Sequence, residues 1–329
     1  MKKSGAVFSW LILFDLFCVA AAVFTGGTPL DAETVIDALI HPLSEGATHT
    51  LIWELRIPRI VMAALVGSGL AICGATFQAI LRNPLAEPYT LGVSGGGALG
   101  ATIAIIAGIS GFPMVLICFT GCTLSIGIVL GAASMKDFTN SMLILTGVIM
   151  SFLFSSIVMF IFAVASSRDV HASILWLMGS LSVPEPASIR IMVFLALPLM
   201  LLLWGCAKDM NLLSLGDEKA FHLGLDAVKT KASLLIVASL ITGACVAVSG
   251  IIGFIGLMIP HLMRKALGAD HLVLLPSSML AGAGFLILSD CVSQIIIRPL
   301  ELPVGVITGM IGGIFFIVYL LRAEPAEVM

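Results

Sequence analysis

The stretch Arg82–Ala98, RNPLAEPYTLGVSGGGA, interrupts two long apolar runs with a charge, an amide, two prolines and a cluster of glycines. Pro84 and Pro88 cannot continue a helix, because proline lacks the amide hydrogen and its ring clashes with the preceding turn. The glycines at the start of the next apolar run allow neighbouring backbones to approach closely. The stretch therefore predicts a tight turn that joins two closely packed helices.

The composition around this turn indicates a membrane protein. Of 329 residues, 59% are hydrophobic and 11% are charged, and the mean hydropathy is +1.15. The apolar residues form runs of roughly 18–24 residues, which is the length a helix needs to cross about 30 Å of hydrocarbon. Strand alternation is absent from these runs, and backbone groups in lipid must be paired internally. We therefore predict an all-α polytopic membrane protein, with residues 1–329 forming a single transmembrane domain.

The breaks between apolar runs divide the chain into ten predicted transmembrane helices. They cover approximately residues 7–25, 58–81, 91–108, 113–134, 141–164, 190–207, 231–249, 252–263, 274–297 and 304–322. The eighth is too short to cross the bilayer upright, so we expect a short or tilted helix there. A tight turn at Ser249 and Gly250 should join it to the seventh.

The basic residues set the orientation of this bundle. With the N-terminus in the cytoplasm, the cytoplasmic side carries Lys2, Lys3, Arg82, Lys136, Lys208, Lys219, Lys229, Lys231, Arg264, Lys265 and Arg322. The outer side then carries only Arg56, Arg59, Arg168, Arg190 and Arg298. This is the positive-inside bias of membrane proteins, so we predict that both termini are cytoplasmic.

Three segments outside the bundle are predicted to form short helices. The outer loop 26–55 contains an amphipathic stretch at 31–42, and a second outer helix should begin near Asp169 and end at the prolines before residue 187. The cytoplasmic segment 208–231 has apolar residues at helical spacing and a glycine stop at Gly224. Its apolar face can pack on its own bundle or dock a cytoplasmic partner, and both alternatives stay open on spacing alone.

Catalytic and cofactor motifs are weak throughout. Gly95, Gly97 and Gly100 match GxGxxG, but no strand precedes them, and no GxxxxGK[ST] motif occurs. The six histidines have no metal-ligand spacing, and the seven cysteines fall in or beside apolar runs with no CxxC pair. The net charge of −3 offers no argument for binding nucleic acid. We predict no enzymatic activity, no resident metal or cofactor and no nucleic-acid partner.

Two groups of charged residues carry functional hypotheses. Asp15 and Asp290 lie inside apolar runs, where ionisable groups are costly, so an ion-coupled secondary carrier is an alternative function. Arg56 and Arg59 are three residues apart and share a helix face where the second helix begins. Arginine forks suit the docking of an acidic protein surface. Interfacial anchoring by snorkelling is the other interpretation.

The motifs, in their order along the chain, resemble those of the permease subunits of ATP-binding-cassette importers for vitamin B12, ferric siderophores and haem. The matching stretches are RIPR (Arg56–Arg59), GxxxQ (Gly74–Gln78), the opening stretch Arg82–Ala98, LTGV (Leu145–Val148), WLMGSL (Trp176–Leu181), LLSLGDEKAFHLG (Leu212–Gly224), GFIGLMIPHLMR (Gly253–Arg264), DH (Asp270 and His271), LSD (Leu288–Asp290) and ELPVGVITGMIGGIFF (Glu301–Phe316).

This resemblance implies a subunit of ten helices in the inner (cytoplasmic) membrane. It also implies a homodimer with the pathway on its two-fold axis, an external substrate-binding protein, a metal-chelate substrate and two cytoplasmic ATPase subunits that bind ATP and Mg²⁺.

The same resemblance assigns roles to residues of this chain. The ATPase-coupling residues are Leu212, Leu215, Gly216, Ala220, Leu223 and Gly224. The candidates that line the pathway are Ser94, Gly95, Gly96, Gly97, Ser151, Ser155, Gly305, Gly309 and Gly312. The candidates for the cytoplasmic gate are Asn83, Pro84, Leu85, Thr139, Asn140 and Ser141.

Arg56 and Arg59 become docking residues for the binding protein. Many members carry a further arginine four residues after the aspartate of the ninth helix, where this chain has Gln294. Either Arg298, one helical turn further along, supplies that charge, or this docking contact is absent.

Overall fold

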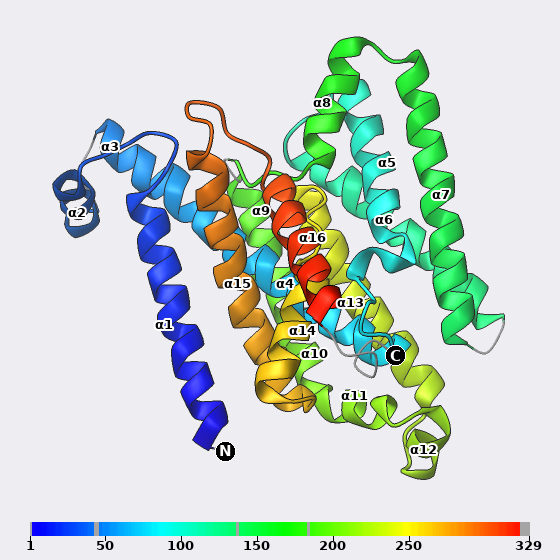
Figure 1. Cartoon of the computed structure of the whole chain (residues 1–329). Helices are drawn as coiled ribbons and strands as arrows, with labels where there is room; N and C mark the ends of the chain where they lie inside the picture. Colours follow the sequence, from blue (N-terminus) through cyan, green and yellow to red (C-terminus); the bar gives the residue numbers. More distant parts are fainter. Residues whose placement is uncertain (1, 43–45, 136–137, 183–184, 323–329) are drawn as a thin grey trace.

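The structure is a computed structural model that describes residues 2–42, 46–135, 138–182 and 185–322, and it is a bundle of helices (Figure 1). The helices of the bundle are α1 (Lys2–Phe24), α4 (Ile57–Leu81), α5 (Val93–Ile106), α6 (Phe112–Ser134), α7 (Asn140–Val164), α9 (Pro186–Ile191), η3 (Met192–Ala196), α10 (Leu197–Gly205), α13 (Ala227–Ser249), α14 (Ile255–Leu267), α15 (His271–Ile295) and α16 (Val304–Arg322). The shorter elements at its two ends are α2 (Ala32–Ile40), α3 (Ala47–His49), η1 (Thr50–Arg56), η2 (Pro88–Leu91), α8 (Ser167–Leu177), α11 (Ala207–Ser214) and α12 (Asp217–His222).

The predicted helical fold is confirmed, and each of the ten predicted spans coincides with a helix or, for the sixth, with the continuous run α9, η3 and α10. Within the described residues, eight helices are long and apolar enough to cross a membrane. The third and eighth predicted spans are the shorter helices α5 and α14. The number of crossings stays a prediction.

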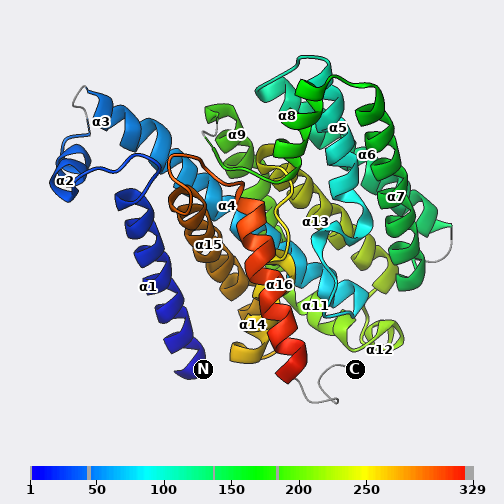
Figure 2. The same ribbon diagram turned by 45° about the horizontal axis from the view of Figure 1, so that its top comes forward.

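The segments predicted for the two sides of the membrane lie at opposite ends of the bundle. Figure 2 shows α11 and α12 at the same end as the start of α1 and the end of α16, while α2, α3 and α8 lie at the other end. This arrangement agrees with the division made from the basic residues. The side that faces the cytoplasm stays a prediction, and Lys136 lies outside the described residues.

Helix α4 forms the centre of the bundle and packs against α13, α14 and α15. Most of its residues from Met62 to Leu81 are buried. Gly67 lies against Gly282 of α15, and Gly74 lies against Gly256 of α14, so closely that a Cβ atom at either position would overlap the facing carbonyl. Small residues drive such contacts in lipid, because association there depends on close van der Waals packing.

The outer helix predicted to begin near Asp169 is present, but the prediction that it ends at the prolines was wrong. Helix α8 begins at Ser167, because the Ser166 hydroxyl accepts the Asp169 amide and caps the first turn. It ends at Leu177, and Gly179 follows with a φ of +75°. A glycine in the left-handed region ends this helix before the prolines are reached.

Candidate functional site

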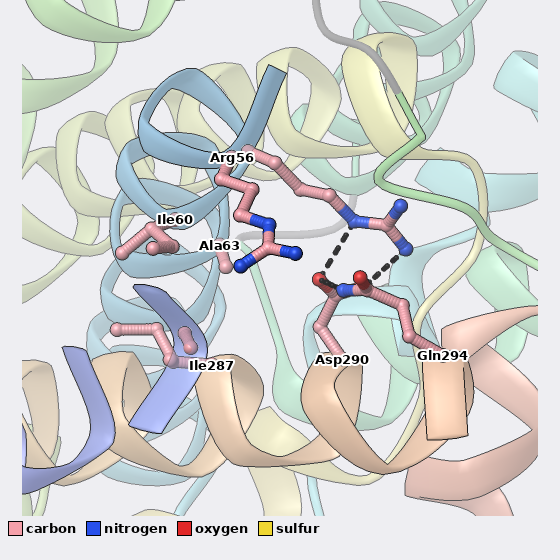
Figure 3. Close-up of a pocket in the computed structure, with 8 residues that line it drawn as sticks. Arg56, Ile60, Ala63, Ile287, Asp290 and Gln294 are labelled. Atoms are coloured by element: carbon pink, nitrogen blue, oxygen red, sulfur yellow. Dashed lines mark hydrogen bonds and ion pairs between the residues drawn. The ribbon is translucent and has the colours of Figure 1, made fainter. Parts of the chain in front are cut away.

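The first candidate site is a cluster of charged residues at the start of α4, the end that we predict to face outward. Arg59 donates from Nε to one carboxylate oxygen of Asp290 at 2.8 Å and from Nη2 to the other at 2.9 Å. Its remaining nitrogen, Nη1, donates to Glu301 at 2.8 Å. Figure 3 shows Asp290 and Gln294 of α15 facing this end of α4. The bidentate pair is buried, since the two side chains are only 12% and 6% exposed.

The other two arginines of this cluster bind neutral carbonyl groups. Arg56 is 7% exposed, and it donates to the carbonyls of Val23 and Thr28 at 2.6 Å. Arg298 donates to the carbonyl of Gly26 at 2.7 Å. Both therefore keep their full positive charge, whereas the charge of Arg59 is balanced by two carboxylates. The structure thus brings the three predicted docking arginines together, and each one donates hydrogen bonds to acceptors of the same chain.

Sequence reasoning missed the partner of Asp290. The apolar run around Asp290 contains no basic residue, and its partner is Arg59, 231 residues away along the chain. Gln294, at the position where the family resemblance led us to expect arginine, donates to Asp290 at 2.8 Å. The available signal was that RIPR and LSD each lie near the outer end of an apolar helix, and such ends meet when the helices pack.

The second candidate site is the pair of short helices α11 and α12 at the opposite end. Gly216 precedes α12 and Gly224 follows it. Their φ angles are +111° and +89°, a region that glycine adopts without a Cβ penalty. Ala220 and Leu213 are buried against the bundle, whereas Leu215, Phe221 and Leu223 are more than half exposed. Leu212 is half-buried. The segment packs on its own bundle with one apolar side and leaves another uncovered.

A group of polar side chains fastens α12 to the bundle. Asp217, the first residue of α12, accepts from Lys231 of α13 at 2.6 Å and from Arg82 at 3.1 Å. Lys231 is only 3% exposed along its side chain, and it also donates to Asn140 at 3.2 Å. Asn140 in turn donates to the carbonyl of Leu81 at 3.0 Å. We call Asp217, Lys231, Arg82 and Asn140 the inner brace.

The inner brace joins two predictions that the sequence made separately. Asn140 was predicted as a gate residue, and Asp217 lies between the predicted coupling residues Gly216 and Ala220. The structure connects them through Lys231, to which the sequence analysis assigned no role. A lysine at the start of an apolar helix was the signal, because such a cation needs a partner once it is buried.

The opening stretch Arg82–Ala98 is anchored to the turn before α14. The Glu87 carboxylate accepts the Phe254 amide at 2.8 Å, and the Tyr89 hydroxyl donates to the Ile252 carbonyl at 2.9 Å. Burial raises the pKa of Glu87 above its usual value, and the Phe254 amide opposes that shift. The predicted tight turn between packed helices is therefore held on two sides, by α4 and by α14.

The residues predicted for the gate differ in exposure. Asn83 accepts the Leu85 amide at 2.9 Å, which closes a local turn. Pro84 and Leu85 project from it and are exposed. Thr139 and Ser141, on either side of Asn140 at the start of α7, are also exposed.

The residues predicted to line the pathway lie in different surroundings. Gly96 and Gly97 are buried where α5 packs against α6 and α13, so the structure gives them a packing role. Gly305 faces the carbonyls of Met178 and Ile251, and Gly312 faces the Phe254 side chain. The others are at least partly accessible: Ser94, Gly95, Ser151, Ser155 and Gly309.

The side chains that could hold a metal ion are scattered in the part of the chain that the structure describes. In that part of the chain, no three His, Cys, Asp or Glu residues lie together in a way that could hold a metal ion. The seven cysteines are free thiols, and all except the half-buried Cys206 are buried.

A comparison with known families decides the identity of the fold. The profile of the FecCD transport family matches residues 12–322. The chain belongs to the FecCD transport family. The cobalamin import system permease protein of Halobacterium salinarum is 38% identical over 94% of this chain and 84% of its own length. The hemin transport system permease protein of Yersinia pestis is 37% identical over 97% of this chain and 98% of its own length.

A solved structure supports the same assignment to the FecCD family. This structure, described as an inward-facing metal-chelate type ABC transporter, aligns with a TM-score of 0.84 at 30% identity and covers 97% of this chain and 100% of its own. The predicted resemblance to permease subunits of ATP-binding-cassette importers is confirmed. In such importers the ATPase is a separate subunit, so this FecCD chain is not itself an enzyme.

The buried Arg59–Asp290 pair makes a stability prediction. Arg59→Gln should lower the free energy of unfolding by about 3–5 kcal/mol, because it leaves the Asp290 carboxylate buried without its cation. The double variant Arg59→Gln/Asp290→Asn should recover part of that loss, since the uncompensated charge is then gone. Thermal unfolding of the purified protein in micelles measures both, with the exposed Arg168→Gln as the control. Equal stability of Arg59→Gln and the control would contradict the structural role of the pair.

Proposed function

We propose that this FecCD protein is the transmembrane permease subunit of an ATP-binding-cassette importer that moves a metal chelate into the cytoplasm. The chelate is a ferric siderophore, haem or cobalamin, because related permeases serve the import of cobalamin, hemin and iron(3+)-hydroxamate. The observation that carries the proposal is the segment α11–α12, which exposes Leu215, Phe221 and Leu223 at one end of the bundle while the inner brace fastens it. An uncovered apolar surface rimmed by polar groups is typical of a protein interaction site.

The proposed assembly contains two copies of this permease and two cytoplasmic ATPase subunits that bind ATP and Mg²⁺. It lies in the inner (cytoplasmic) membrane. The homodimer interface is assigned to α7 and α16, which bury little of their surface within one subunit. These helices also carry Ser151, Ser155 and Gly309, which would then line the pathway on the two-fold axis. Weakly polar and small side chains suit the passage of a large, partly apolar chelate.

In the proposed mechanism, ATP binding and hydrolysis in the partner move α11–α12, and the pathway alternates between outward and inward openings. The inner brace supports this step, because Asp217 connects α12 to α13 through Lys231 and to the end of α4 through Arg82. A displacement of α12 therefore acts on those helices together. Through Lys231 it also reaches Asn140 at the predicted gate.

An external binding protein is assigned to the outer arginine cluster. Within the described residues Arg56 and Arg298 donate to carbonyls and to no carboxylate, so they keep a charge that attracts acidic surfaces. Arg59 contributes to the same face, although a docking carboxylate would have to compete with Glu301, which is 39% exposed. Docking therefore draws mainly on the charge of Arg56 and Arg298.

Membership of the FecCD family disfavours the alternative function, which is an ion-coupled secondary carrier. Asp290 is bound to Arg59 by two hydrogen bonds, which is a structural pairing rather than an open proton site. Asp15 of α1 lies against Gly284 of α15 and faces that helix contact.

Uptake by reconstituted transporter tests the proposed function. The permease, its ATPase and its binding protein are placed in liposomes and offered haem, cobalamin and a ferric hydroxamate. We expect ATP-dependent uptake of one chelate that a proton uncoupler does not stop. Uptake that persists without the ATPase and stops with the uncoupler would support the secondary carrier instead.

The turn that ends α12 gives a sharper test of coupling. A Cβ atom added at Gly224 would have no described atom within 4 Å apart from those of its chain neighbours. Gly224→Ala therefore acts through the backbone, because a φ of +89° is unfavourable for alanine. We expect this variant to hydrolyse ATP in the assembled transporter while uptake falls several-fold. Gly205→Ala is the matched control, because Gly205 also has free space and its φ is not positive. Unchanged uptake per ATP in Gly224→Ala would remove α12 from the coupling step.

A further inference from the structure

A basic pocket lies between helices at the end of the bundle that carries α11 and α12. It has a volume of about 290 Å³ and is lined by Gln78, Ala79, Arg82, Asn83, Pro84, Ser214, Arg264, Ala269 and His271. Two of these residues are arginines, and none is acidic. The proposed transport mechanism uses Arg82 from this set, but it gives no role to Arg264 or His271.

Arg264 is fixed in place without a carboxylate partner among the described residues. It lies half-buried in the last turn of α14, and its Nη1 donates to Gln78 Oε1 at 2.9 Å. The Gln78 amide nitrogen is held by the carbonyls of Gly256 and Leu257, both at 3.3 Å. Gln78 therefore orients the guanidinium while leaving its charge uncompensated, and further N–H groups of the fork stay available.

Arg82 and His271 add complementary groups to the same pocket. Arg82 uses Nη2 on Asp217 and is 40% exposed along its side chain. His271 is 3% exposed, and its Nδ1 contacts Asn211 Oδ1 at 2.7 Å. Since that amide oxygen also accepts the His271 backbone N–H, Nδ1 carries the ring proton. The Nε2 atom is buried and has no hydrogen-bond partner among the described residues.

The nearest carboxylates are turned to other partners. Asp270 accepts from Asn211 at 2.8 Å and from the Leu272 amide at 3.1 Å. Asp217 is held by Lys231 as well as by Arg82. A ligand in the pocket would therefore meet Arg264, which has no carboxylate partner among the described residues, and Arg82, whose Nη2 is already paired with Asp217.

We propose that this pocket binds the phosphate of an anionic phospholipid headgroup from the cytoplasmic leaflet, with Arg264 and Arg82 on the phosphate. Arginine forks match phosphate oxygens, and basic pockets between transmembrane helices on the cytoplasmic side are typical sites for anionic headgroups. Phosphatidylglycerol is an anionic phospholipid whose phosphate suits these two arginines. Because Arg82 belongs to the inner brace, an occupied pocket acts on the residue that holds α12.

Lipid binding to the purified full chain tests the proposal without any transport assay, so it stands or falls independently of the proposed function. Native mass spectrometry compares phosphatidylglycerol with zwitterionic phosphatidylcholine, and inorganic phosphate is added as a competitor. We expect preferential binding of phosphatidylglycerol. Removing one charge-assisted contact with Arg264→Gln should weaken it about ten-fold or more.

Two further variants separate the pocket from general effects on the fold. Arg82→Gln should weaken phosphatidylglycerol binding in the same way, and Arg322→Gln should leave it unchanged, because Arg322 is an exposed arginine at the end of α16. Equal binding of both lipids, or equal binding by all variants, would overturn the proposal. Tight binding of inorganic phosphate without a preference for phosphatidylglycerol would assign the pocket to a free anion and also overturn it.

Discussion

The close contact of α4 with its neighbours is the constraint on which the rest of the structure depends. Gly67 and Gly74 let this central helix approach α15 and α14 at backbone distance. Close packing of this kind replaces the hydrophobic effect, which does not drive helices together in lipid. It also fixes the two ends of α4, where Arg59 meets Asp290 and Arg82 meets Asp217. The outer arginine cluster and the inner brace are therefore features of one rigid element.

The two ends differ in how their charges are satisfied, and this difference matters for function. At the outer end, Arg59 is neutralised by carboxylates of its own chain, while Arg56 and Arg298 remain charged. At the inner end, Arg264 is oriented by an amide and keeps its charge in an open pocket. In our two proposals, the uncompensated arginines at both ends attract anionic partners, which are a protein surface outside and a lipid headgroup inside.

The sequence predicted the helices well because hydropathy and proline breaks are local properties of the chain. It also predicted helix in the segment 208–231 and a stop at Gly224, because apolar spacing and glycine stops are local properties too. The ion pairs could not be predicted, since Arg59 and Asp290 are 231 residues apart and only packing brings them together. The pathway assignments were limited in another way, because small residues serve pathways and helix contacts alike. Gly96 and Gly97, which the structure buries between helices, illustrate that ambiguity.

The central claim is that α12 and α4 move as one body because the inner brace connects them. Spin labels at Lys219 of α12 and at the partly exposed Val61 of α4 measure this directly in the assembled transporter, with the half-buried Cys206 replaced by serine. The account predicts that the distance between the two labels is the same in the nucleotide-free and ATP-bound states. A change larger than the width of the label distribution would contradict it.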